Sequence, residues 1–420
     1  MRSLIPLAVR LVLLAPLALA GCDSSPAVPD AASGDAAAPD AAAATDAPAV
    51  TCTVAPVAIS HDAELPGAAR KHLVELAGHP LAVCNDGTPA SYTLRPGVGQ
   101  GRKRWVIFLK GGGQCSTSED CASRFTHSPG LMSSAGVVDG ASDELSGILS
   151  ASPDINPDFY DANTVEIAYC SSDWHTGDRA GDAAAPTSEL AHWQFRGRAI
   201  VRAVLEELDG SGLAAANEVL LAGGSAGAVG ASSLADDVRA ALPATTRLVS
   251  LADAAYVISY PAYDPATRTE STARPTPPEQ LAVEATAAWG GRGDASCYDV
   301  APIGEHVACR AEAYLFPRAM VAVPTMIRQS QLDVSQLGRL IDDADHSAEA
   351  DAFRERFAAE LRAQLAQVVL PHAVFSRHDD AHTAMTSNDL WTSTKIGDAS
   401  LRGAVGGWYR APCTPLRIIE

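Results

Sequence analysis

The stretch from residue 218 to residue 228, EVLLAGGSAGA, predicts a buried strand that turns sharply into a helix. Its apolar run ends at Ala222, and a helical pattern begins near Ala226. Residues 223–227, GGSAG, fit the pattern G-x-S-x-G, in which a serine occupies a crowded strand-to-helix turn that needs small neighbours. Because a helix N-terminus presents free N–H groups to developing negative charge, Ser225 is the candidate nucleophile. A phosphate-binding glycine turn is the alternative, weakened because no Gly-Lys-Ser/Thr follows.

Outward from this turn, strand and helix patterns alternate through the chain. The predicted strands cover residues 105–109, 164–169, 218–222, 247–251, 320–327 and 368–375, and the predicted helices cover residues 191–208, 226–241 and 349–365. Such alternation predicts a single α/β domain with a mostly parallel, doubly wound sheet and helices on both faces. Ligands bind beyond the carboxyl ends of the strands in such sheets, so the loops after these strands should share one edge. Residues 264–278 are rich in Pro, Thr and charge and are expected to form a surface excursion.

The composition restricts the partners of the chain. Among 420 residues, 31 Lys and Arg stand against 50 Asp and Glu, which gives a formal charge of −19. Nucleic acid is therefore not an expected partner, because phosphate backbones are bound by Lys and Arg. Outside the extreme N-terminus no uncharged apolar run is long enough to span a bilayer, which excludes a polytopic membrane protein.

The N-terminus predicts export. Residues 1–22 combine a positive start with a short apolar segment, and their last four residues, Leu19-Ala20-Gly21-Cys22, resemble the bacterial lipoprotein box. A plain secretory signal is the alternative. Residues 23–50 are almost wholly Ala, Asp, Pro and Ser, so they predict a disordered linker. We therefore expect an exported bacterial lipoprotein of the cell envelope, facing the periplasm or the cell surface. Its catalytic domain, residues 51–420, would meet the membrane only through a lipid anchor at Cys22.

The remaining cysteines favour disulfide bonds. Of nine cysteines, eight are left once Cys22 is set aside, and an even number in an exported protein is typical of disulfides. The spacing favours two short-range pairs, Cys115–Cys121 and Cys297–Cys309. A metal site is the alternative, but the chain lacks a CxxC motif with a second one behind it.

A serine needs a base, and in α/β hydrolases the chain order is Ser, acid, His. His382 lies in a polar loop just after the last predicted strand, where such a base should emerge; His378 is its nearest competitor. Asp333 follows the 320–327 strand and is the candidate acid, while Asp342, Asp343 and Asp345 remain open as alternatives. Residues 378–382 could instead bind a metal, but no fixed ligand spacing is present, so no metal is expected.

A glycine run follows the first predicted strand. Residues 111–113 are Gly-Gly-Gly, and main-chain N–H groups in such a loop can approach a ligand closely. In hydrolases with this kind of serine turn, a glycine-rich loop on an earlier strand supplies the second donor to the oxyanion. The candidate donors are the backbone N–H groups of Ala226 and of Gly113 or Gln114. A plain tight turn is the alternative.

Several blocks, in chain order, resemble the pectin acetylesterase family, which includes the Notum-type carboxylesterases. These blocks are residues 82–89 with 91–92, 105–115, 169–170 with 176–178, 195–197, 224–227, 251–254, Asp333 with 336–337, and 381–383 with Asp389 and Trp391. The resemblance implies an α/β-hydrolase-like fold and cofactor-free hydrolysis of O-acyl esters. Carried over by motif, it implies Ser225 as nucleophile, His382 as base and Asp333 as acid. Asp253 matches a family aspartate outside the triad and is expected to be structural.

The chain departs from the family pattern at several positions. The family loop usually reads Gly-Gly-Gly-Trp-Cys, and Gln114 stands at the tryptophan position, so the acyl preference is not predicted. Ala255 stands where the family has glycine, and Thr383 follows the histidine where a cysteine is usual. None of these changes removes a reacting group.

The sequence thus predicts an exported serine carboxylesterase that acts on O-acyl esters, above all O-acetyl esters, of a polysaccharide. The alternatives are a lipid-acyl esterase of the Notum kind, a serine peptidase or amidase, and a non-catalytic surface-binding lipoprotein on the same scaffold.

Overall fold

A ten-stranded sheet runs through the residues described by the computed structural model, 52–271 and 287–420. In spatial order its strands are β14 (Arg417–Ile419), β11 (Ala373–Ser376), β10 (Thr325–Arg328), β7 (Arg247–Asp253), β6 (Glu218–Gly224), β3 (Arg104–Leu109), β5 (Asn163–Ile167), β2 (Ser91–Arg95), β1 (Ala69–Leu73) and β4 (Ser142–Asp143). Each strand from β14 to β5 runs parallel to its neighbour, and β2, β1 and β4 extend that edge with antiparallel pairing. The predicted mostly parallel sheet is confirmed.

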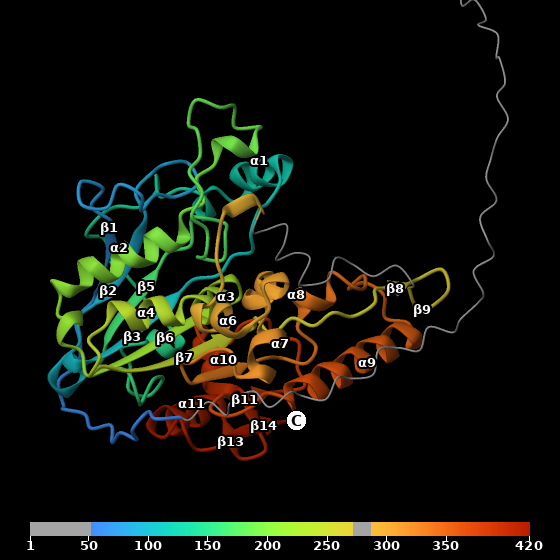
Figure 1. Cartoon of the computed structure of the whole chain (residues 1–420). Helices are drawn as coiled ribbons and strands as arrows, with labels where there is room; N and C mark the ends of the chain where they lie inside the picture. The colour runs from blue at the N-terminus through green and yellow to red at the C-terminus, as the bar shows by residue number, and fades with distance from the viewer. Residues whose placement is uncertain (1–51, 272–286) are drawn as a thin grey trace, which may run out of the picture. The chain divides into compact units, whose positions relative to one another are not determined.

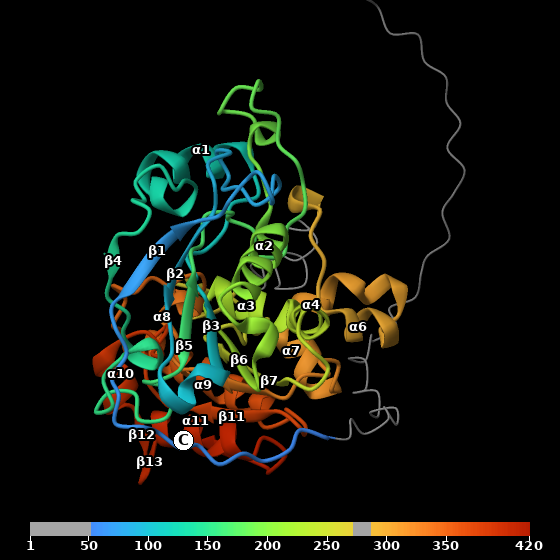
Figure 2. The ribbon, with the colours of Figure 1, turned by 90° about the vertical axis from the view of Figure 1, so that its left-hand side faces the viewer.

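Helices cover both faces of the sheet, as Figures 1 and 2 show. They are α1 (Ser118–His127), α2 (Gly197–Asp209), α3 (Ala226–Ser233), α4 (Ala235–Ala241), α6 (Ala295–Val300), α7 (Glu312–Leu315), α8 (Val334–Leu337), α9 (Ala348–Leu365), α10 (Asn388–Ser393) and α11 (Leu401–Arg410). Side chains alternate across a strand, so Ile107 of β3 packs in the core with α2 and α9, while Phe108 faces the core with α10 and α11. The doubly wound arrangement is therefore confirmed.

Several predicted elements have different bounds in the structure. The helix predicted over 191–208 begins only at Gly197. The helix predicted over 226–241 is two helices, α3 and α4, which meet at Leu234. The strands predicted over 320–327 and 368–375 begin only at Thr325 and Ala373. Each of these strands starts after a proline, Pro324 or Pro371, because proline has no N–H to donate to a sheet.

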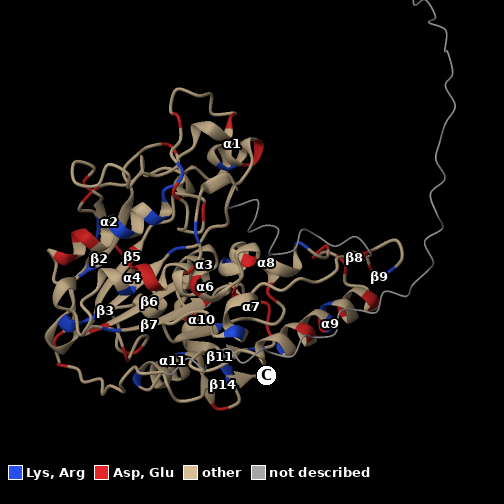
Figure 3. Cartoon of the chain, viewed as in Figure 1, with Lys and Arg blue, Asp and Glu red and all other residues tan. Residues whose placement is uncertain are grey.

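The long helix α9 buries one apolar face. Its buried residues include Phe353, Phe357 and Leu361. Acidic and basic residues are interspersed along the rest of the helix (Figure 3). Burial of this apolar stripe, rather than the charged side, supplies the packing free energy of the helix.

Four disulfides connect the described chain. They are Cys52–Cys413, Cys84–Cys170, Cys115–Cys121 and Cys297–Cys309, and the last two are the short-range pairs expected from the spacing. Disulfides persist in oxidising compartments, which supports a secreted or extracellular protein. None of the helices in the described ranges has the length and apolar character needed to cross a bilayer.

Several expectations lie on residues outside the described ranges. The signal peptide, the lipidated Cys22 and the linker all fall within residues 1–50. The expected excursion over 264–278 is described only as far as residue 271, where β8 (Tyr263–Asp264) and β9 (Thr269–Glu270) form a short hairpin.

A buried carboxyl group lies on α7. Glu312 is fully buried, and its Oε1 accepts a hydrogen bond from Ser232 Oγ at 2.7 Å. Burial raises the pKa of Glu312 from 4.5 to about 8. Above pH 4.5 the unfolded chain loses the Glu312 proton, while the folded chain keeps it up to about pH 8. The contribution of Glu312 to the free energy of unfolding therefore falls as the pH rises from 4.5 to about 8.

Replacing Glu312 with glutamine should remove this pH dependence, because an amide keeps an acceptor for Ser232 and cannot ionise. Relative to wild type, the free energy of unfolding of Glu312→Gln should rise by about 1 kcal/mol per pH unit between pH ~5 and ~8. Denaturant titrations across this range measure the difference. Glu119→Gln, at an exposed position of α1, should follow wild type at every pH. Parallel curves for wild type and Glu312→Gln would contradict the prediction.

Candidate active site

Ser225 lies on the sharp turn between β6 and α3. Its φ of 54° and ψ of −123° are unusual for a residue with a side chain, and its N–H donates to the Asp253 carbonyl at 2.7 Å. Added Cβ atoms at Gly223 and Gly227 would overlap the backbone of Gly227 and Leu109, respectively. Small residues are therefore required on both sides of Ser225, as the G-x-S-x-G pattern predicts.

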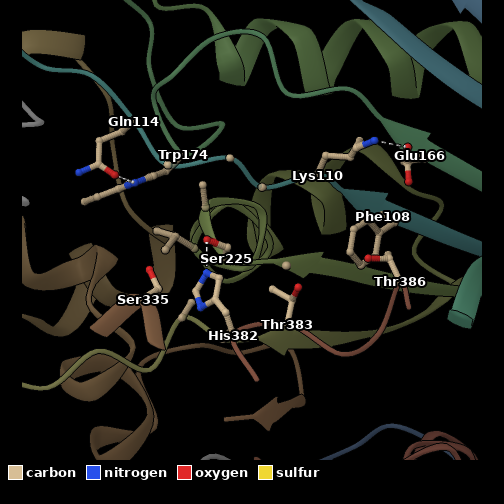
Figure 4. A pocket seen from close by; sticks show the side chains of 18 of the residues that line it. Phe108, Lys110, Gln114, Glu166, Trp174, Ser225, Ser335, His382, Thr383 and Thr386 are labelled. Carbon is tan, nitrogen blue, oxygen red and sulfur yellow. Dashed lines mark hydrogen bonds and ion pairs between the residues drawn. The ribbon is translucent and has the colours of Figure 1, made fainter. Parts of the chain in front are cut away.

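The structure brings the three predicted side chains into one hydrogen-bonded chain. His382 Nε2 lies 2.8 Å from Ser225 Oγ, which it faces in Figure 4. On the other side of the ring, Nδ1 lies 2.9 and 3.0 Å from the two carboxylate oxygens of Asp333. A carboxylate only accepts, so Nδ1 carries the ring proton and Nε2 is left as the acceptor for the serine O–H.

Asp333 is held as a fully buried acceptor. It precedes α8, and its Oδ1 accepts from the N–H groups of Ser335 and Gln336 at 2.8 and 3.3 Å. Its Oδ2 accepts from Gln329 Nε2 at 2.9 Å. These bonds fix the carboxylate against the ring, so the ring tautomer and orientation are both set.

The competing candidates lie elsewhere. His378 Nε2 pairs with Glu355 at 3.0 Å, and Asp342 and Asp343 are exposed in the turn after α8. Asp345 accepts from the Ser347 N–H ahead of α9, at 2.9 Å. Across the described ranges, no group of three or more His, Cys, Asp or Glu side chains is arranged to hold a metal ion.

The loop that carries His382 is clamped by a buried ion pair. Asp253 Oδ2 accepts from the N–H groups of Ala384 and Met385 at 2.8 and 2.9 Å. Arg328 Nη1 lies 3.2 Å from Asp253 Oδ1 and donates to the carbonyls of Ala381 and His382 at 3.1 Å each. Asp253 is therefore structural, as expected. Sequence reasoning missed Arg328, whose signal was an arginine at the end of an apolar strand.

The glycine-rich loop packs directly against the serine turn. A Cβ atom at Gly111 would overlap the carbonyl of Gly224, so only glycine permits this approach. Gly113 has a φ of 71°. Among the described residues, no protein acceptor is bonded to the backbone N–H groups of Gly113, Gln114 or Ala226. All three residues line the cavity that contains Ser225.

This cavity has a volume of about 660 Å³ and lies at the carboxyl ends of the parallel strands, at the predicted edge. Figure 4 shows two differently built sides. On one side Lys110 and Glu166 form an ion pair at 3.0 Å. On the other, Trp174 Nε1 donates to Gln114 Oε1 at 3.0 Å. The serine between them can therefore meet a polar group on one side and an aromatic wall on the other.

Comparison with known proteins agrees with this geometry. The family model described as Pectinacetylesterase matches residues 65–419. The chain belongs to the pectinacetylesterase family. The expected resemblance is thereby confirmed, and the mostly parallel sheet with its serine turn is the pectinacetylesterase version of an α/β-hydrolase-like fold.

Individual relatives align with this chain over different lengths. The palmitoleoyl-protein carboxylesterase NOTUM of Mus musculus is 42% identical over 147 residues, which are 35% of this chain and 27% of that protein. Pectin acetylesterase 11 of Arabidopsis thaliana is 34% identical over 177 residues, 42% of this chain and 43% of that protein. The palmitoleoyl-protein carboxylesterase notum1a of Danio rerio is 30% identical over 338 residues, 78% of this chain and 63% of that protein. The chain thus spans less than two thirds of the length of each of these relatives.

A solved structure has the same fold. The Wnt deacylase Notum from Drosophila superposes with a TM-score of 0.71 at 26% identity, over 84% of this chain and 96% of that one. The shared fold therefore extends over nearly the whole of that structure.

Proposed function

We propose that this chain is an exported serine carboxylesterase that hydrolyses O-acyl esters, above all O-acetyl esters of a polysaccharide. The observation that carries the proposal is the chain of hydrogen bonds from Ser225 through His382 to Asp333, which opens into the cavity. A hydroxyl is a weak nucleophile at neutral pH, and an adjacent base with a buried carboxylate behind it activates the hydroxyl.

The reaction follows from these contacts. Ser225 Oγ attacks the ester carbonyl carbon while His382 Nε2 takes the serine proton, and Asp333 stabilises the resulting imidazolium. The negative charge that forms on the carbonyl oxygen is bound by backbone N–H groups of Ala226 and of Gly113 or Gln114. His382 returns the proton to the leaving alcohol, which leaves an acyl-serine. Water, activated by the same histidine, then releases the acid and restores Ser225.

The substrate class rests on the polar side of the cavity and on the family. Lys110, Glu166, Asp143 and Glu144 line this side, and such groups suit an alcohol that carries many hydroxyls. Plant relatives carry the name pectin acetylesterase, which supports an acetylated polysaccharide. The names of the animal relatives refer to a palmitoleoyl-protein, so a lipid-acyl ester is the second candidate.

Trp174 should limit the length of the acyl group. Its half-buried ring packs edge-on against Trp289 at 4.9 Å and is tied to Gln114, so an aromatic wall stands near the position where Gln114 replaces the family tryptophan. Trp174→Ala should raise the ratio of octanoyl to acetyl ester turnover by about tenfold or more, since a single methylene in an apolar pocket is worth at least about tenfold. Trp174→Phe keeps a ring and should retain most of the acetyl preference. An unchanged ratio in Trp174→Ala would remove this tryptophan from the acyl site.

The location follows the same proposal. An export signal over residues 1–22, lipid attachment at Cys22 and a linker over 23–50 would hold the domain at the bacterial cell envelope. The four disulfides of the domain support an oxidising compartment.

Two measurements test the proposed function. Acetate release from acetylated polysaccharides, compared with cleavage of a peptide amide of matched acyl group, separates an esterase from a peptidase. Labelling by a fluorophosphonate, located by mass spectrometry, identifies the nucleophile. We expect acetate release, little amide cleavage and a label on Ser225. The proposal fails if neither ester nor probe reacts, as a non-catalytic lipoprotein would require.

A further inference from the structure

The carbonyl groups of the glycine-rich loop are held from outside by side chains that the mechanism above does not use. Arg124 of α1 donates through Nη2 to the Gly112 carbonyl at 2.6 Å. The Tyr169 hydroxyl donates to the Gly113 carbonyl at 2.7 Å. His175 Nε2 lies 2.9 Å from the Lys110 carbonyl.

The geometry points to a role for these donors in catalysis. We propose that Arg124 and Tyr169 are positioning residues that aim the oxyanion-binding N–H groups of the glycine-rich loop at Ser225. This inference rests on the proposed esterase function. It adds an explanation of how the N–H groups of the glycine-rich loop are held in position before the oxyanion forms.

The argument begins with the planarity of the peptide bond. In a trans peptide the C=O of one residue and the N–H of the next point in opposite directions. Holding the Gly112 carbonyl therefore fixes the direction of the Gly113 N–H, and holding the Gly113 carbonyl fixes that of the Gln114 N–H. Gly112, Gly113 and Gln114 line the cavity, whereas Arg124 and Tyr169 do not. Carbonyls held by these two side chains therefore point away from the cavity, and both N–H groups turn toward it.

Glycine residues make such an external hold necessary. Gly112 and Gly113 have φ values of 150° and 71°, and a glycine backbone reaches many other conformations at little cost. Donors that are preorganised lose no free energy to reorientation when the oxyanion forms. The loop itself cannot supply that rigidity, so it must come from neighbouring side chains.

The two donors are themselves held in place. Arg124 Nε donates to Ser172 Oγ at 2.8 Å, and α1 is joined to the loop through Cys115–Cys121. The Tyr169 ring is buried, and its oxygen accepts the Trp174 N–H at 2.9 Å. Burial raises the pKa of Tyr169 above its ordinary value, so the hydroxyl stays protonated and can donate.

The segment that follows β5 has a strained backbone and contacts the glycine-rich loop. Ser172, Trp174 and His175 all have positive φ, at 52°, 56° and 60°. Three such residues within four positions are unfavourable, and strain of this kind is kept where function needs it. Ser172 also accepts the Cys115 N–H at 3.2 Å, so the connection and the glycine-rich loop form one hydrogen-bonded unit.

A short alkyl trifluoromethyl ketone tests the inference directly. Ser225 Oγ adds to its carbonyl carbon, the carbonyl electron pair moves to oxygen, and the serine proton passes to His382. The resulting hemiketal oxyanion occupies the site of the transition-state oxygen, and fluorine NMR reports its pKa. A loop whose N–H groups are misaligned stabilises this anion less, so the hemiketal pKa rises.

Tyr169→Phe should lower kcat for an acetyl ester by about 10- to 100-fold with little change in KM, and should raise the hemiketal pKa. Arg124→Met should act in the same direction, and Arg124→Lys, which keeps a donor, should recover part of the loss. Tyr160→Phe is the matched control. The Tyr160 hydroxyl also donates to a backbone carbonyl, that of Asp62 at 3.1 Å, but Tyr160 precedes β5 whereas Tyr169 follows it. This control should match wild type in both readouts.

The outcomes separate the inference from the proposed function. An unchanged kcat in Tyr169→Phe, or a lower kcat with an unchanged hemiketal pKa, would overturn the positioning role and leave the esterase intact. Failure of wild type to form any adduct that depends on Ser225 would overturn both. Tyr169→Phe keeps the buried ring, so it remains decisive even if Arg124→Met does not fold.

Discussion

Replacing Ser225 with alanine should lower kcat for an acetyl ester by about 10⁵- to 10⁶-fold, the usual effect of removing a triad nucleophile. The reason is that Ser225 Oγ is the atom that would form the acyl intermediate, and no other hydroxyl is bonded to His382 among the described residues. Steady-state turnover of acetyl, butyryl and octanoyl nitrophenyl esters measures the loss. KM has no comparable reason to change, because the walls of the cavity remain.

Ser233→Ala is the matched control for this substitution. Ser233 lies at the far end of the same helix, α3, is buried, and does not line the cavity. It should retain turnover close to wild type. Equal turnover in Ser225→Ala and wild type would remove the catalytic assignment altogether.

Replacing Asp333 with asparagine should lower kcat by about 10⁴-fold while the fold is retained. Asparagine keeps an oxygen that can accept from the Ser335 and Gln336 N–H groups, so the start of α8 need not change. Its amide N–H₂ takes the place of Oδ2, 3.0 Å from His382 Nδ1, and donates toward the ring there, and the neutral side chain no longer stabilises an imidazolium. The ring then favours the other tautomer, in which Nε2 carries the proton and cannot take one from Ser225.

Asp342→Asn provides the comparison, because Asp342 was the nearest competing acid in the sequence. It is exposed, and among the described residues its Oδ1 accepts from the local Ala344 N–H alone, at 3.0 Å, so turnover should stay close to wild type. A large loss in Asp342→Asn together with full turnover in Asp333→Asn would reverse the assignment of the acid. Thermal unfolding of both variants separates loss of catalysis from loss of structure.

Much of the fold could be predicted from local patterns. The apolar run before Ser225 and the alternation of strands with helices predict the parallel sheet and the edge at which the cavity lies. The strands β1, β2, β4 and β14, which lie toward the two edges of the sheet, were missed, since they are short and mix polar with apolar residues. Helix α11 was also missed, although its buried residues recur at helical spacing.

The three reacting side chains of the candidate site could be predicted from the sequence, but the residues that hold their loops in place could not. Ser225 had a motif, and His382 and Asp333 had a position after a strand, strengthened by the family resemblance. Arg328 and Tyr169 had no motif, because each acts on backbone atoms of a segment remote in the chain. Backbone carbonyls leave no trace in a sequence, so such contacts become visible only in three dimensions.

The sequence by itself determined the elements that depend on near neighbours, which are the strand-to-helix turn at Ser225 and the alternation of strands with helices. It also favoured the two short-range cysteine pairs without fixing them. Only the tertiary structure decided which aspartate meets His382 and how Cys52–Cys413 and Cys84–Cys170 pair. The physical reason is that periodicity and turn chemistry act over a few residues. Contacts between distant segments are instead set by the way the whole sheet packs against its helices.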